Sequence, residues 1–68
     1  MSTLYEITVV GSAGPTLSAA LQGFQLVTSE RGRARFVGAV EDQAALQGAL
    51  HRLYDLQVEL LEVRRIGD

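Results

Sequence analysis

The segment Gly11 to Gly14 contains the first residues of this chain whose types and spacing could serve chemistry. It separates a run of alternating apolar residues from a short helical pattern that begins with a proline. Free backbone amides at such a strand-to-helix junction can hold an anion. We therefore consider Gly11, Ser12, Gly14 and Thr16 as candidate ligand-binding residues, with an ordinary turn as the alternative. Two of the three glycines of a dinucleotide fingerprint, G-x-G-x-x-G, are missing here.

Arginines alternate along the segment RGRARF, which begins at Arg31 and imitates the spacing of an RNA-recognition strand. In that strand aromatic rings stack on the bases, whereas this chain has Arg33 and Arg35 at the two stacking positions. We expect these arginines to be solvated or paired with Glu30. Together with the net charge of −2, this predicts a protein that does not bind nucleic acid.

His51 is the only histidine, and the chain has no cysteine. A single imidazole cannot assemble a structural metal site, and no Ser or Cys nucleophile can be paired with it from the sequence. We expect His51 to face solvent on the polar side of a helix, next to Asp55. The sequence thus predicts a protein that is not an enzyme and that carries no metal and no other cofactor.

The segment from Glu41 to Asp55 is the longest stretch with the periodicity of a helix, so we expect much of the chain to pack against that helix. Asp42 precedes it as a plausible N-cap. On the opposite side of the helix from its apolar stripe, Ala44 and Gly48 lie one turn apart, where either a close neighbour approaches or the pairing is chance. The apolar stripe of this predicted helix consists of Leu46, Ala49, Leu50 and Leu53.

Alternating apolar residues predict four strands, at 4–10, 24–29, 34–40 and 57–65. A short helix is expected at 16–22, with Gly23 ending it in a left-handed conformation. Gly32 suits the positive φ of a hairpin loop at 30–33. The residues expected to face the core from the first three strands are Tyr5, Ile7, Val9, Phe24, Leu26, Ala34, Phe36, Gly38 and Val40.

The resulting order, βαββαβ, predicts a single α+β domain over residues 1–68. Two strand-helix-strand units joined by a hairpin are typical of a ferredoxin-like sandwich. Right-handed crossovers place both helices on one face of a four-stranded antiparallel sheet whose strand order is 4-1-3-2. The other face of the sheet, which we call the open face, then has no cover.

Length, element order and the motif SAGPTL are similar to those of ACT-type regulatory domains, in which a D-x-P-G-x-L-like turn leads from the first strand into the first helix. This resemblance implies a small-molecule effector near that turn. The second half, GAVEDQAALQGALHRLYDLQVELLEVRRI, resembles a group of small stand-alone bacterial proteins of unassigned function. The shared features are the pattern D-Q-A-A-L-x-G-x-L, an apolar last strand and an arginine near its end. That likeness implies the fold and no activity.

A chain of 68 residues buries only about 60% of the surface that its unfolded form exposes. Small domains are often stabilised by disulfides, bound metals or a partner subunit. Disulfides and metals are not expected here, so association with a partner subunit is the remaining source of stability. We predict a homodimer through the open face or the edge of the sheet. The predicted interface residues are Leu4, Val10, Val27, Val37, Ala39, Leu61 and Val63, with Val58 and Leu60 as the alternative to the last two because the alternation in that strand is ambiguous. A β-bulge, or a strand that is apolar on both faces, would explain the ambiguity.

The longest uninterrupted apolar run, Phe36 to Val40, is too short to span a membrane. The N-terminal residues lack the basic start and apolar core of a signal peptide, so we expect a cytoplasmic protein. The absence of Lys and Asn indicates a GC-rich bacterial genome. These observations predict a small non-catalytic interaction or regulatory module that acts as a homodimer and could engage a second protein. The alternative is an ACT-like sensor that binds a small anionic metabolite at the glycine turn.

Overall fold

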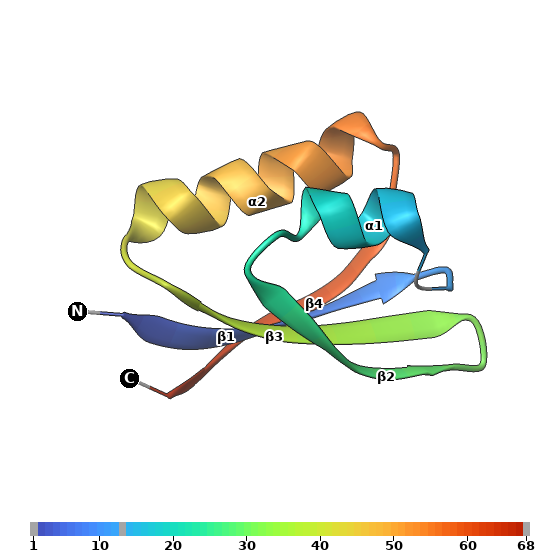
Figure 1. The fold of residues 1–68 in the computed structure, drawn as a ribbon, viewed down its shortest axis with the longest axis horizontal. Coiled ribbons are helices and arrows are strands. Elements are labelled where there is room, and N and C mark those ends of the chain that lie inside the picture. Colours follow the sequence, from blue (N-terminus) through green and yellow to red (C-terminus); the bar gives the residue numbers. More distant parts are fainter. Residues whose placement is uncertain (1, 13, 68) are drawn as a thin grey trace.

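The computed structural model of the chain describes residues 2–12 and 14–67. Ala13, which belongs to the predicted glycine turn, lies outside the described residues. Within them the elements follow one another as β1 (Thr3–Val10), α1 (Pro15–Ala20), β2 (Phe24–Glu30), β3 (Arg33–Val40), α2 (Gln43–Asp55) and β4 (Leu60–Gly67). Both helices lie on the same face of the sheet (Figure 1).

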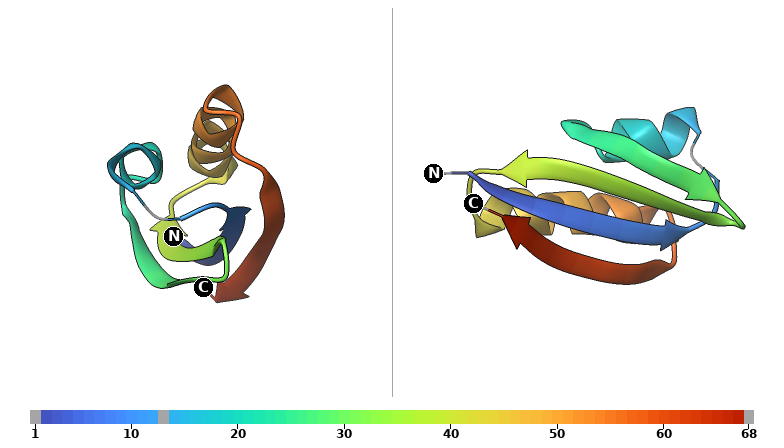
Figure 2. Two further views of the ribbon diagram at one scale, coloured as in Figure 1. Left: turned by 90° about the vertical axis from the view of Figure 1, so that its right-hand side faces the viewer. Right: turned by 90° about the horizontal axis from the view of Figure 1, so that it is seen from below.

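The four strands form one antiparallel sheet in the order β2-β3-β1-β4. This is the predicted order read from the opposite edge. β1 and β3 are central, while β2 and β4 are the two edge strands. Figure 2 shows the strongly twisted sheet with the helix layer on one side and nothing on the other. The predicted α+β class, the antiparallel sheet and the two helices are therefore confirmed.

Alternation along the two central strands builds the core. Ile7 pairs with Phe36 and Val9 pairs with Ala34, and all four side chains are buried beneath the helices. Side chains with period two line one face of a strand, so the same register sends the intervening residues to the open face. The buried residues of the core cluster are Ile7, Val9, Leu17, Ala20, Leu21, Ala34, Phe36, Val40, Leu46, Ala49 and Leu53.

The helix α2 begins where the sequence predicts. The Asp42 carboxylate accepts a hydrogen bond from the Ala45 amide, Oδ1 to N 2.8 Å, which satisfies a donor of the first turn. Leu46, Ala49 and Leu53 of the predicted stripe are buried, and Leu50 is partly buried against the core. Arg52, on the same helix, donates from Nε to the Ala20 carbonyl at 2.8 Å and so ties the end of α1 to α2.

The edge strands depart from strict alternation. Leu26 pairs with Phe36 and was expected in the core, but it is 47% exposed, because α1 ends at Ala20 and is too short to cover this edge. A bulge follows in β2 between Leu26 and Thr28. β4 begins later than predicted, at Leu60, because Gln57 adopts a positive φ of 58° after α2.

A bulge, one of the two explanations considered for the ambiguous alternation, is present in the pairing of β4 with β1. The register against β1 shifts between Thr8 and Val9, which brings Glu62 opposite Thr8 and Leu60 opposite Val9. Val63 then pairs with Ile7 and packs against the core, as does Val58. The placement of Val63 on the open face was therefore wrong, since a bulge between the two valines removes the simple alternation from which it was inferred.

Candidate functional site

All four predicted ligand-binding residues line one hollow at the turn between β1 and α1. Its volume is about 320 Å³, and we call it the turn hollow. The candidate residues Gly11, Ser12, Gly14 and Thr16 contribute its polar and glycine lining. The remaining walls are apolar and come from Val10, Pro15, Leu17, Leu56 and Val58.

The backbone amides of this turn are only partly available. The Gly11 amide donates to the Gly32 carbonyl at 2.7 Å, and Gly11 has a φ of 122° that favours glycine. The Gly14 carbonyl accepts from the Ser18 amide at 2.9 Å and starts α1. A ligand in the turn hollow would therefore meet the hydroxyls of Ser12 and Thr16 and a largely apolar surface.

The open face carries rows of side chains that cross the sheet, and these rows are polar. Thr28, Arg35, Thr8 and Glu62 are consecutive cross-strand neighbours from β2 to β4. The next row consists of Gln25, Val37, Glu6 and Arg64. The predicted apolar members of this face are consequently separated by charged residues, and they do not form one contiguous patch.

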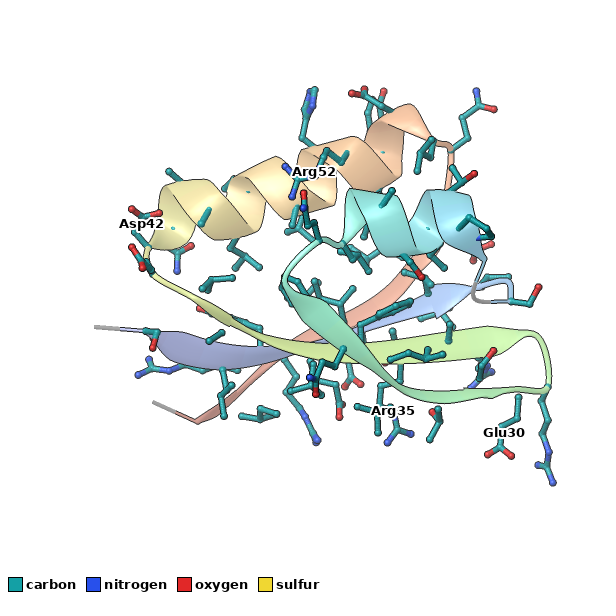
Figure 3. The ribbon with its side chains drawn as sticks, in the orientation of Figure 1. Glu30, Arg35, Asp42 and Arg52 are labelled. Carbon is teal, nitrogen blue, oxygen red and sulfur yellow. The ribbon has the colours of Figure 1, made fainter. Side chains whose placement is uncertain are left out.

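Glu6 is the most buried charged residue on the open face, with a residue exposure of 9%. Its carboxylate lies between two guanidinium groups, with Oε1 3.4 Å from Arg64 Nη2 and Oε2 4.0 Å from Arg35 Nη1. Both arginine side chains remain about half exposed. Arg35 extends from the sheet away from the helices (Figure 3). Glu6 thus holds Arg64 more closely than Arg35.

A second hollow opens on this face near the β2-β3 hairpin. It measures about 440 Å³, and we call it the arginine hollow. The three arginines of this hollow were singled out from the sequence, but a cavity was not predicted. Two of its lining residues, Thr8 and Glu62, come from β1 and β4, which are distant from the arginines in the sequence. Its lining residues are Thr8, Thr28, Glu30, Arg31, Arg33, Ala34, Arg35 and Glu62.

The predicted interface residues are scattered over the sheet. Leu4 and Val10 are exposed at opposite ends of β1, whereas Val37 is partly buried and Ala39 is exposed on β3. Val27 is exposed at the bulge of the β2 edge. The structure does not bring these residues into one cluster with Leu61.

Among the described residues, β4 carries three large exposed apolar side chains, one more than β1 and one more than β2. Leu60, Leu61 and Ile66 are each 41 to 42% exposed, and β4 has no strand neighbour on its outer side. We call these three residues the β4 edge. Ile66 was missed because the last strand was predicted to end at residue 65, whereas β4 continues to Gly67 after a second register shift between Leu4 and Tyr5.

A family model matches residues 4–64, and its description is "Domain of unknown function (DUF8691)". The chain belongs to this family. No curated protein and no solved structure matches the chain. The DUF8691 match covers both helices and every strand except the first residue of β1 and the end of β4. The turn hollow, the arginine hollow and two of the three residues of the β4 edge therefore lie within the family domain.

His51 takes part in two local contacts of this DUF8691 domain, both with residues of α2. Its Nδ1 lies 3.4 Å from Asp55 Oδ2, one turn along α2, and its ring lies 6.3 Å from that of Tyr54. Within 2–12 and 14–67, no group of three His, Cys, Asp or Glu side chains is placed to hold a metal ion. No helix among the same residues is long and apolar enough to cross a membrane.

Proposed function

We propose that this chain is a small non-catalytic interaction or regulatory module of the bacterial cytoplasm, that its fold is ferredoxin-like, and that it acts as a homodimer. The observation that carries the dimer is the β4 edge. Leu60, Leu61 and Ile66 lie on an edge strand that pairs with β1 on its inner side and, among the described residues, with no strand on its outer side. An apolar edge of this kind is a template for pairing with another strand.

A second copy of the chain is the occupant that suits this edge. Two β4 strands related by a two-fold axis run antiparallel, and the same apolar residues then face one another across the contact. Pairing would satisfy the free backbone groups and remove three large side chains from water, at roughly 25 cal/mol per Å² of apolar surface. A domain of this size without disulfides gains proportionally more from such burial.

The β4 edge is also compatible with a regulatory role. Pairing through β4 leaves the helices, the β2 edge and the open face accessible, so a second protein could bind a dimer without displacing it. The proposal of a non-catalytic module is supported by His51, whose described contacts are only those to Asp55 and Tyr54 at the exposed surface of α2.

The experiment compares two charge substitutions at opposite edges of the sheet. Sedimentation equilibrium at micromolar concentration should give the wild-type chain twice its monomer mass. Leu61→Glu should shift the mass toward the monomer, because it places a charge in the apolar contact. Val27→Glu is the matched control, since it introduces the same charge at an exposed apolar position of the β2 edge.

The outcomes separate the possible interfaces. Dissociation by Val27→Glu alone would move the contact to the β2 edge, and dissociation by Val37→Glu alone would move it to the open face. A folded wild-type monomer at this concentration would show that the homodimer proposal is wrong. Far-ultraviolet circular dichroism of each variant establishes that the fold persists.

The second candidate function is an ACT-like sensor at the turn hollow. It is favoured by one observation, that Gly11, Ser12, Gly14 and Thr16 all line the same hollow. Its apolar walls favour a metabolite that combines one carboxylate with an aliphatic body. Titration calorimetry with isovalerate should then detect binding that Thr16→Val weakens. Equal heats for isovalerate and chloride at matched ionic strength would eliminate this candidate.

A further inference from the structure

The charges of the described residues are divided between the two sides of the molecule. The helix side is acidic, because α2 and its flanking segments carry only Arg52 as a cation. The acidic residues there are Glu41, Asp42, Asp55 and Glu59. Four arginines, Arg31, Arg33, Arg35 and Arg64, lie instead on the open face and the hairpin, beside the three carboxylates of Glu6, Glu30 and Glu62. Among the described residues this side therefore has a formal net charge of +1, whereas the whole chain has −2, and an anion is attracted to the sheet side rather than to the helix side.

Two arginines of the arginine hollow make no ion pair with the carboxylates that the structure describes. Among residues 2–12 and 14–67, no ion pair joins Arg31 or Arg33 to an acidic side chain, although Glu30 and Glu62 line the same hollow. Arg35 is the third guanidinium, and it only reaches Glu6 at 4.0 Å. Figure 3 shows Glu30 and Arg35 extending from the same side of the sheet, away from the helices. The lining of the hollow contains three guanidinium groups and the two carboxylates of Glu30 and Glu62, so its formal net charge is +1.

The backbone gives these groups a common direction. Arg33 and Arg35 are two residues apart on β3, so both project to the open face. Thr28 and Thr8 flank Arg35 on the two neighbouring strands, and their hydroxyls can donate to the same ligand. Guanidinium forks match the oxygens of phosphate and carboxylate groups. A volume of about 440 Å³ lies in the range of small-molecule sites.

We propose that the arginine hollow binds a small dianionic ligand, either a phosphate monoester or a dicarboxylate. Arg31 and Arg33 supply two guanidinium groups that make no ion pair with the described residues, and the threonine hydroxyls orient the oxyanion. The site goes beyond the proposed function, because all of its lining except Thr8 and Glu62 comes from β2, β3 and the hairpin between them rather than from the β4 edge.

The test is a titration of the ¹⁵N-labelled chain, followed by amide chemical shifts at constant ionic strength. Inorganic phosphate is the first probe and succinate is the second. The probe with the lower dissociation constant shows whether the site prefers a phosphate group or a dicarboxylate. The expected result is saturable shifts confined to the hairpin and to the neighbouring positions Thr8 and Glu62. Arg33→Gln should weaken binding by about tenfold or more, which is the loss expected for one charge-assisted hydrogen bond. Arg31→Gln, in the exposed turn, provides a second test that leaves the strands intact.

Two substitutions that each remove one negative charge distinguish binding of the anion in the hollow from its general electrostatic attraction to the protein. Glu62→Gln removes a carboxylate that lines the hollow and should tighten binding several-fold. Glu41→Gln makes the same chemical change on the helix side and should leave the affinity unchanged. The proposal is overturned if neither probe gives saturable shifts, if both arginine variants bind as the wild type does, or if the two glutamate variants tighten binding equally.

Discussion

At the residue scale, Gly38 is required by its neighbour across the sheet. It pairs with Phe24, and a Cβ added at Gly38 would lie 2.7 Å from the phenylalanine ring and 3.0 Å from the Phe24 Cα. The ring can rotate away, but the backbone atom cannot do so without moving β2. We therefore expect Gly38→Ala to lower the free energy of unfolding by about 1 to 3 kcal/mol, the usual range for overpacking. Urea denaturation measures this change.

Gly48 provides the matched control for the same substitution. A Cβ there would meet only Arg52 Nη1, at 3.7 Å, and the residue lies within α2. Alanine is a better helix former than glycine by roughly 1 kcal/mol, so Gly48→Ala should raise the free energy of unfolding. No close neighbour approaches Gly48 within the described chain. A loss of stability in Gly48→Ala would instead indicate that another molecule packs against this side of the helix.

At the element scale, the stability of α2 on the sheet depends on how far each leucine is buried. Leu53 is 1% exposed, whereas Leu50 is only partly buried. Leu53→Ala should cost about 2 to 5 kcal/mol, as removal of a buried leucine usually does. Leu50→Ala should cost less, because part of its side chain is already in water. Equal losses in denaturant melts of the two variants would mean that the helix is rotated from the orientation described.

At the scale of the whole molecule, the single chain is already compact. Its Cα radius of gyration is 10.9 Å, close to the roughly 11 Å expected for a compact domain of this length. Dimerisation would thus add stability to a folded chain and would not be needed to form the core. The unfolding midpoint of the wild type should then rise with protein concentration, because association stabilises the native state by mass action.

The variant Leu61→Glu serves as the reference for that measurement. Its melting midpoint should be lower than that of the wild type and should not change with concentration. Small-angle scattering at the same concentrations should give a larger radius of gyration for the wild type than for the variant. A wild-type midpoint that is constant over the accessible concentrations would contradict a reversible dimer.

The sequence by itself determined the elements and the core, because these depend on local patterns. The alternation of Ile7 and Val9 with Thr8, the helical spacing of Leu46 and Leu53, and the cap at Asp42 are each visible within a few residues. The central strands have to be buried on one side, so a shift by one residue would expose their whole apolar set. Strand order then followed from short connections and crossover handedness.

Only the tertiary structure decided the edge strands and the candidate sites. The placement of Val63 in the core and the exposure of Leu60 depend on bulges, and a bulge arises where two strands distant in sequence come into register. The arginine hollow has the same origin, because Glu62 joins Arg33 and Arg35 only across two strand pairings. The electrostatic energy of a ligand in a site depends on its distance from each charged group. The amino-acid composition gives the number of charges but not these distances.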